Sequence, residues 1–150
     1  MDQIDAAILR ELQDNARITF HDLSERVGLS PSPCARRIRL LEKAGVIVGY
    51  CALIDESQAG FPFSVFVSVK LVRQVDDALT EFEAAISKYP EVVDCWLMTG
   101  NRDYLLRVAV RDISEFEAFL TGRLTKIPAV ASIESSIPLR RVKSGLARLS

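Results

Sequence analysis

A hydroxyl-rich, strongly basic segment around residues 30–43 carries the side chains best suited to recognise another molecule. Serine hydroxyls and the N-terminus of a helix both bind phosphate, and an arginine can form a two-pronged hydrogen bond with guanine in the DNA major groove. We therefore predict that this segment contacts double-stranded DNA. The predicted contact residues are Ser30, Ser32, Arg36, Arg37 and Arg39.

These five residues have different predicted roles. The two serines lie at the start of the segment and are the candidates for phosphate contacts. Arg36 is the candidate for reading guanine. Arg37 has a partly structural alternative, in which it forms an ion pair with an acid such as Glu25 or Glu42.

The basic segment has the signals of a short helix. Ser30 can cap this helix through its hydroxyl, and Pro31 and Pro33 fall in the first turn, where a missing N–H is tolerated. Gly45 suits the left-handed residue that ends a helix. Three apolar residues repeat at helical spacing and should face inward. They are Cys34, Ile38 and Leu41.

Two helices are predicted upstream, which makes the region a candidate helix-turn-helix. The spacing of apolar residues over residues 4–12 marks the first helix. Thr19 and Asp22 have the spacing of a capping box at the start of the second helix, which ends at the Gly28-Leu29 turn. A plain helical bundle with a solvated charged face is the alternative.

The charge distribution supports DNA binding only locally. The chain has a formal net charge of −1, and residues 1–50 contain seven acids and seven lysines or arginines. Residues 27–43 contain four basic residues and one acid. Because each phosphate contact adds affinity, a weakly charged monomer should need several copies on DNA to bind firmly. The acids of the first helix are expected to lie away from the DNA. They are Asp2, Asp5, Glu11 and Asp14.

Beyond Gly45 the pattern changes to that of β-structure. Residues 46–54 are predicted to be extended and β-rich, within a strand-bearing linker that ends near Gly60. An internal duplication follows. The motif at residues 72–75 is echoed at 110–113, and the motif at 88–92 is echoed at 126–130 with the same offset.

Each half of the duplication has the pattern strand, helix, strand, which gives the βαββαβ order of a ferredoxin-like domain. Strands are expected at 63–71, 91–98, 104–110 and 130–139, and helices at 76–88 and 114–126. Both helices should cover one face of the sheet and leave Phe66, Trp96 and Leu106 as candidates for the other. An exposed apolar sheet face favours a two-fold dimer.

The predicted central hairpin turns at residues 99–103 and has two alternative roles. Gly100-Asn101 is a turn signal and aspartate is common near turns, so the role of Asp103 can be purely structural. Alternatively, backbone N–H groups near Gly100 hold a carboxylate while Asp103 attracts an ammonium group. Those two charges suit a free amino acid.

The chain resembles the Lrp/AsnC family of bacterial and archaeal transcription regulators. The hairpin and its following strand, at residues 99–106, look like the Gly-x-x-Asp-Tyr effector loop of that family. The N-terminal match includes the run Val-Gly-Leu-Ser-Pro-Ser-Pro-Cys at residues 27–34. Its other segments are residues 5–9, 15–17, 22–24, 37–38, 41–42 and 44–50.

The resemblance implies a DNA-binding domain joined to a domain that binds an effector between subunits and forms oligomers. It implies a homodimer and a higher oligomer, such as an octamer, with an amino acid or close relative as effector. Many relatives carry two threonines on the last strand where this chain has Ile133 and Ser135, so an apolar or unusual effector is compatible. The effector residues implied are Thr99, Gly100, Asn101, Asp103, Tyr104 and Ser135.

The sequence therefore predicts an α+β protein. A winged-type helix-turn-helix domain at residues 1–50 is joined by a β linker at 51–60 to a ferredoxin-like domain at 61–150, which includes a C-terminal tail. The predicted function is sequence-specific transcriptional regulation, with assembly or DNA affinity that responds to an amino acid. An architectural DNA-binding protein without a small-molecule response is the alternative.

No enzyme, cofactor or metal site is predicted. The single histidine, His21, lies inside the helix-turn-helix, and no catalytic triad, metal-ligand cluster or phosphate-binding glycine loop is present. Cys34, Cys51 and Cys95 are odd in number and far apart, which favours buried thiols in a reducing cytoplasm. The N-terminus lacks the pattern of a signal peptide, and no apolar run approaches the length of a membrane span.

Overall fold

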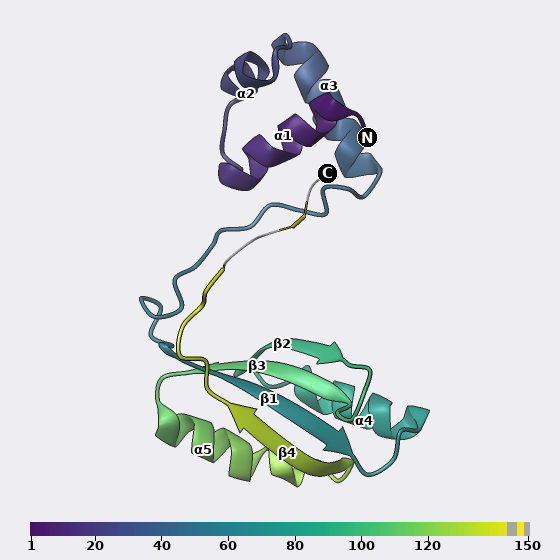
Figure 1. Cartoon of the computed structure of the whole chain (residues 1–150), viewed down its shortest axis with the longest axis vertical. Helices are drawn as coiled ribbons and strands as arrows, with labels where there is room; N and C mark the ends of the chain where they lie inside the picture. Colours follow the sequence, from purple (N-terminus) through teal and green to yellow (C-terminus); the bar gives the residue numbers. More distant parts are fainter. Residues whose placement is uncertain (144–146, 149–150) are drawn as a thin grey trace. The chain divides into compact units, whose positions relative to one another are not determined.

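The computed structural model describes residues 1–143 and 147–148, which divide into two compact units (Figure 1). The first unit consists of Met1–Leu53 and the described residues from Val142 onward, and the second is Ile54–Arg141. The division falls inside the segment 51–60 that the sequence suggests as a linker. Each unit has its own apolar core and is described by itself.

The first unit contains three helices, which are α1 (Gln3–Asp14), α2 (Phe20–Val27) and α3 (Pro31–Lys43). They agree with the three helices predicted from sequence. Their inward residues meet in one apolar cluster. The buried members are Ile8, Leu9, Leu23, Cys34, Ile38 and Leu41. The inward stripe of α3 is therefore the predicted one.

The ends of these helices are fixed in three different ways. At the start of α1, Asp2 and Asp5 form a reciprocal capping box that the sequence reasoning missed. At the start of α2, the Thr19 hydroxyl accepts a hydrogen bond from the Asp22 N–H at 3.1 Å, which is one half of the predicted capping box. Gly28 then takes the left-handed conformation, with φ +71°, that ends α2.

Ser30 occupies the N-cap position of α3, but its hydroxyl makes no capping hydrogen bond, so the predicted capping role is wrong. A capping hydroxyl accepts from the N–H of the second or third helical residue, and one of these two donors is missing here because the third residue is Pro33, which has no N–H. The exposed Ser30 hydroxyl is thus left for another partner.

The second unit is a four-stranded sheet with helices on one face (Figure 1). All its strand pairs are antiparallel, and the strand order is β2-β3-β1-β4. This is the predicted ferredoxin-like βαββαβ arrangement. In chain order the elements are β1 (Phe63–Leu71), α4 (Asp76–Ile86), β2 (Val92–Leu97), β3 (Tyr104–Val110), α5 (Ile113–Gly122), the 3₁₀ turn η1 (Leu124–Lys126) and β4 (Val130–Ser136).

Strands β1 and β3 have the predicted bounds, whereas other elements are shorter. The predicted helix 114–126 is interrupted after Gly122, a poor helix former, and continues only as η1. The last strand stops at Ser136 instead of Leu139, and Pro138 would in any case give no N–H to a ladder.

The side-chain alternation of β1 and β3 decides which face is covered. Val65, Val67 and Val69 on β1 are fully buried beneath α4 and α5, as the alternation predicts. Leu106 on β3 is also fully buried in this core, so its expected place on the open face is wrong. Side chains alternate along a strand, and Leu106 lies directly opposite Val67, which puts both on the helix side.

The open face of the sheet carries the alternate residues. Phe66 is half-buried and pairs with Arg107, while Trp96 is 45% exposed and pairs with Leu105. The expectation that Phe66 and Trp96 lie on this face is therefore correct.

Residues 46–54 form no strand, contrary to the sequence-based expectation. Their composition favours a strand, but no other described segment pairs with them through a ladder of backbone hydrogen bonds. Apolar side chains in it therefore stay exposed, among them Val48 at 94% and Leu53 at 75%. An extended apolar segment of this kind gains stability only when another strand or surface covers it.

Only Cys34 of the three cysteines is buried, so the expectation of three buried thiols is wrong for two of them. Cys51 lies in the unpaired segment and Cys95 on the edge strand β2, and both are exposed. Among the described residues, no helix is long and apolar enough to cross a membrane.

The different capping of α2 and α3 gives a matched pair of substitutions. Thr19→Ala removes an observed capping hydrogen bond and should lower the free energy of opening of α2 by about 1 kcal/mol. Ser30→Ala removes a hydroxyl that caps nothing and should change the opening of α3 by no more than about 0.5 kcal/mol. Amide hydrogen exchange over residues 19–27 and 31–43 measures both. Equal losses in the two variants would contradict the assignment.

Candidate DNA-binding and effector-binding surfaces

The outward face of α3 is the candidate DNA-binding surface. Ser32, Arg36, Arg39 and Lys43 are all exposed, at the helical spacing that places them opposite the buried stripe. Among the described residues, none of these three cations has an ion-pair or side-chain hydrogen-bond partner. The helix therefore presents three uncompensated positive charges and a serine to solvent.

Arg37 is different, because it is held by two carboxylates. One of its guanidinium nitrogens lies 2.8 Å from Asp2 Oδ2 and 2.8 Å from Asp5 Oδ1. Hydrogen bonds to Asp5 and then Asp2 raise the pKa of Arg37. The backbone N–H of Asp5, followed by Arg37, lowers the pKa of Asp2. Arg37 thus joins α3 to the start of α1.

These ion pairs correct two expectations. The partners of Arg37 are not Glu25 or Glu42, because Arg37 lies on the flank of α3 that faces the first turn of α1. Glu42 instead accepts a hydrogen bond from the Tyr50 hydroxyl at 3.0 Å. Asp2 and Asp5 therefore lie directly against α3 at Arg37, closer to the candidate surface than expected from sequence.

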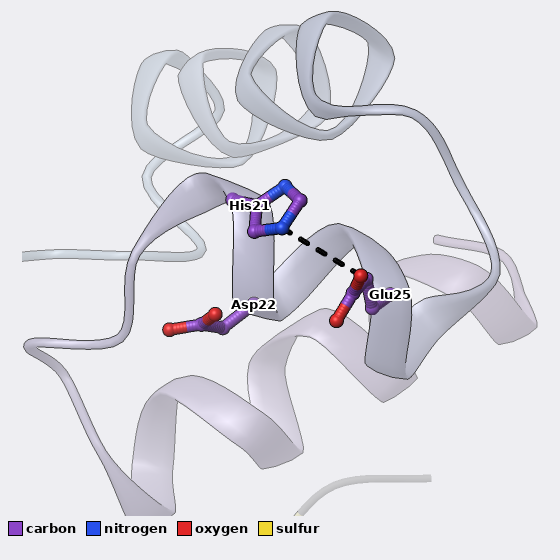
Figure 2. Close-up of side chains that lie close together, drawn as sticks. All are labelled: His21, Asp22 and Glu25. Carbon is purple, nitrogen blue, oxygen red and sulfur yellow. Dashed lines mark ion pairs between the residues drawn. The ribbon is translucent and has the colours of Figure 1, made fainter.

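Three ionisable side chains of α2 also lie close together (Figure 2). The ligand atoms of His21, Asp22 and Glu25 are all within 4.8 Å of one another, and His21 Nε2 is 3.6 Å from Glu25 Oε1. All three residues are exposed and come from a single short helix. His21 and Glu25 are four residues apart, so this is an ordinary surface pair across one helical turn.

The hairpin between β2 and β3 is the candidate effector-binding site. Gly100 has φ +103°, a conformation that favours glycine, and it makes the predicted turn possible. Thr99, Gly100 and Asn101 are exposed at the tip. The structure thus leaves the tip of the hairpin free to contact another molecule.

Asp103 lies beneath this tip and is only 3% exposed. Its Oδ2 accepts a hydrogen bond from the Leu71 N–H at 2.7 Å, and its Oδ1 accepts one from the side-chain amide of Gln74. Its own N–H donates to the Val69 carbonyl at 2.9 Å. The carboxylate therefore fastens the hairpin to the end of β1. A carboxylate has about four lone-pair sites, so both oxygens keep some acceptor capacity.

Tyr104 is 1% exposed and belongs to the core beneath α4. Its hydroxyl donates to Glu83 Oε1 at 2.6 Å, and its ring centroid lies 4.5 Å from that of Phe82. Burial, followed by the hydrogen bond to Glu83, raises the pKa of Tyr104 well above its ordinary value. Within one chain, Tyr104 therefore anchors the start of β3, next to the hairpin, in the core.

The structure does not bring Ser135 to the hairpin. Ser135 lies on the edge strand β4 opposite Val67, so β1 separates it from β3. Ile133 is closer, because it pairs with Val69, the residue whose carbonyl binds the Asp103 N–H.

Sequence reasoning missed two groups that position the hairpin. One is the Gln74 amide, which lies 29 residues from Asp103 and carries no local signal of the contact. The other is Arg102, which donates to Ser132 Oγ at 2.9 Å and to Glu134 Oε2 at 2.8 Å and so ties the hairpin to β4.

The open sheet face contains a cleft of about 770 Å³. Phe61, Phe66 and Trp96 line it with aromatic surface. Arg107 lies among them and pairs with Glu56 at 2.8 Å and with Asp94 at 3.0 Å. The hydrogen bonds that Arg107 donates to Glu56 and Asp94 raise its pKa despite its partial burial. The face thus combines apolar area with a compensated charge, which is typical of a surface that binds another protein.

Two family models together match nearly the whole chain. The model described as a winged helix-turn-helix DNA-binding domain matches residues 1–48, and the model described as the Lrp/AsnC ligand binding domain matches residues 64–147. The chain is 47% identical over 142 residues to the Bkd operon transcriptional regulator of Pseudomonas aeruginosa, covering 95% of this chain and 93% of that protein. It is 42% identical over 143 residues to the leucine-responsive regulatory protein of Haemophilus influenzae, covering 95% of this chain and 86% of that protein.

Solved structures agree. A transcriptional regulator from Neisseria meningitidis, in complex with L-Met, superposes with a TM-score of 0.91 and 39% identity, covering 96% of this chain and 93% of that one. An AsnC family transcriptional regulator from Agrobacterium tumefaciens superposes with a TM-score of 0.91 and 36% sequence identity. The match covers 99% of this chain and 96% of that one.

The hydrogen bonds of Asp103 predict that its removal destabilises the second unit. Asp103→Ala leaves the Leu71 N–H without its acceptor and should lower the free energy of unfolding of the second unit by about 1–3 kcal/mol. Trp96, the single tryptophan, lies in that unit and reports its urea unfolding by fluorescence.

Asn101→Ala is the matched control, because the exposed Asn101 side chain makes no hydrogen bond with another described residue. It should change the free energy of unfolding by no more than about 0.5 kcal/mol. An Asp103→Ala protein as stable as wild type would contradict the fastening role.

Proposed function

Because the chain belongs to the Lrp/AsnC family of DNA-binding transcriptional regulators, we propose that α3 reads DNA and that the hairpin of the second unit responds to an amino acid. The relatives are regulators and not enzymes, so the chain is a regulator too. We place its action in the cytoplasm, on the chromosomal DNA that such a regulator binds.

One observation carries the DNA-binding proposal. Arg36, Arg39 and Lys43 on α3 project outward and form no ion pair with the residues that the structure describes, whereas the adjacent Arg37 is neutralised by Asp2 and Asp5. Free cations on one helix face attract phosphate and can reach base edges. Arg37 then acts mainly by fixing α3 against α1.

The serines at the start of α3 complete this surface. Ser30 and Ser32 are exposed at the positive end of the helix dipole, and the Ser30 hydroxyl is not used as a cap. They are suited to bind phosphate, while Arg36 and Arg39 enter the major groove.

We propose that a second copy of the chain covers the open sheet face. Phe66 and Trp96 expose apolar surface there, and Arg107 between them is already paired with Glu56 and Asp94. A two-fold dimer would bring two copies of α3 to one DNA site. Further association, up to an octamer, belongs to the same proposal.

The effector proposal rests on the exposed tip of the hairpin. Thr99, Gly100 and Asn101 offer backbone and side-chain groups to a ligand, and the L-Met complex of the Neisseria meningitidis relative supports an amino acid as that ligand. Asp103 contributes negative charge from beneath the tip, and Tyr104 holds the strand that carries it.

Ser135 would contribute only if another subunit brings it near the hairpin of its neighbour, since β1 separates the two within one chain. This is compatible with a pocket between subunits. A ligand bound there alters assembly only if it binds one assembly better than another.

Arg36→Ala should weaken binding to the preferred DNA site by about 1–3 kcal/mol per half-site, because it removes a two-pronged contact with guanine. Binding to unrelated DNA should change much less. Titration of labelled duplexes at fixed salt measures both. Arg73→Ala, which removes the same charge from an exposed position of the second unit, is the control. Equal affinities for wild type and Arg36→Ala would contradict the role of Arg36.

Light scattering at micromolar concentration should give a mass at least twice the 16.7 kDa of one chain. Phe66→Asp places a charge on the proposed interface and should shift the protein toward monomer while the second unit stays folded. A wild-type monomer at this concentration would exclude the proposed dimer.

A thermal-shift screen against the common amino acids should identify an effector, because a ligand at one hundred times its Kd stabilises the native state by about 2.7 kcal/mol. The same compound should change DNA affinity or oligomer size. Asp103→Ala should abolish that response while leaving DNA binding without effector intact.

Two results would contradict this. A folded Asp103→Ala protein that responds at the same concentration would remove Asp103 from the site. DNA binding that is unchanged by every amino acid would favour the architectural alternative.

A further inference from the structure

Leu40 is an apolar residue on an otherwise polar and basic helix face. It lies on α3 and is 56% exposed, in contrast to the buried Leu41 beside it. The neighbouring outward residues are Arg36, Arg39 and Lys43. A leucine that is 56% exposed leaves much of its apolar surface in water, so that surface is available to a partner.

The surroundings of Leu40 favour DNA as that partner. Leu40 and Arg36 line one groove of about 360 Å³, together with Met1 and Val46. Asp5 is the acid in this groove, and its carboxylate is already paired with Arg37 at 2.8 Å. The uncompensated charge around Leu40 is therefore positive, which suits a polyanion.

The geometry of the helix then points to one base feature. Leu40 follows Arg36 by four residues, so the two side chains lie on the same side of α3 and about 6 Å apart along its axis. A helix enters the major groove at an angle to the duplex axis, and residues three or four apart on it reach neighbouring bases, so this spacing corresponds to about one or two base pairs. Leucine has no polar atom, and the apolar group that the major groove presents is the C5 methyl of thymine.

We propose that Leu40 contacts a thymine methyl, about one or two base pairs from the guanine that Arg36 reads. This inference rests on the proposed DNA-binding function of α3. It makes Leu40 a specificity-determining residue that distinguishes thymine from cytosine at one position of each half-site.

The test uses a duplex that the full-length protein selects from a randomised DNA library. Each thymine of that duplex is replaced in turn by uracil, which removes only the methyl group. Wild type should bind about fourfold more weakly when one particular thymine of a half-site is replaced, since this is the size expected for one buried methyl. That thymine should lie about one or two base pairs from a guanine whose replacement weakens binding by wild type but not by Arg36→Ala.

Leu40→Ala should bind the thymine and uracil duplexes equally at that position. Alanine is a better helix former than leucine and Leu40 is half exposed, so α3 should persist, as hydrogen exchange over residues 31–43 can verify. Leu139→Ala removes an exposed leucine outside α3 and should keep the full thymine preference.

Two results would overturn the proposal. The first is a wild-type protein whose DNA affinity is unchanged by the loss of every thymine methyl. The second is a Leu40→Ala protein that keeps the wild-type ratio of thymine to uracil affinity. If such a variant also changes its oligomer size, the Leu40 surface is a protein contact. If Arg36→Ala also leaves DNA affinity unchanged, the proposed DNA-binding role of α3 is wrong as well. If Arg36→Ala weakens DNA binding, only the proposed role of Leu40 is wrong.

Discussion

The C-terminal sheet has two faces that carry apolar side chains but helices for only one of them. Alternate residues of β1 point toward α4 and α5 and are fully buried, as Val65, Val67 and Val69 are. The residues between them, Phe66 above all, face the uncovered side, where Trp96 is 45% exposed. We propose that a second chain covers this face, which would join two chains and therefore two copies of α3.

Two charged side chains that could bind a ligand instead have partners within the chain. Arg37 belongs to the basic run of α3, yet Asp2 and Asp5 hold it, so it orients the helix. Asp103 has the charge to attract an ammonium group, yet Leu71 and Gln74 already donate to it. In both places the groups that face outward are the neighbours: Arg36 and Arg39 on α3, and residues 99–101 on the hairpin.

Periodicity predicted the elements of this protein well, because one buried face dictates the spacing of apolar residues. The bounds of β1 and β3 and the inward stripe of α3 follow from it. It failed for residues 46–54, whose composition favours a strand but which lack a partner strand, and for Leu106, whose face depends on the register with Val67. Contacts between distant residues, such as Arg37 with Asp2 or Asp103 with Gln74, have no local signature, so side-chain partners were the least predictable part of the site.

We propose that one chain couples DNA reading by α3 to an effector held at the hairpin. Coupling between two binding sites is reciprocal, because the free energy of the doubly bound state does not depend on the order of binding. Calorimetric titration of the effector into the protein, with and without its DNA site, tests this directly. The effector affinity should change on DNA by the same factor by which the effector changes DNA affinity. Equal effector affinities with and without DNA would contradict the account.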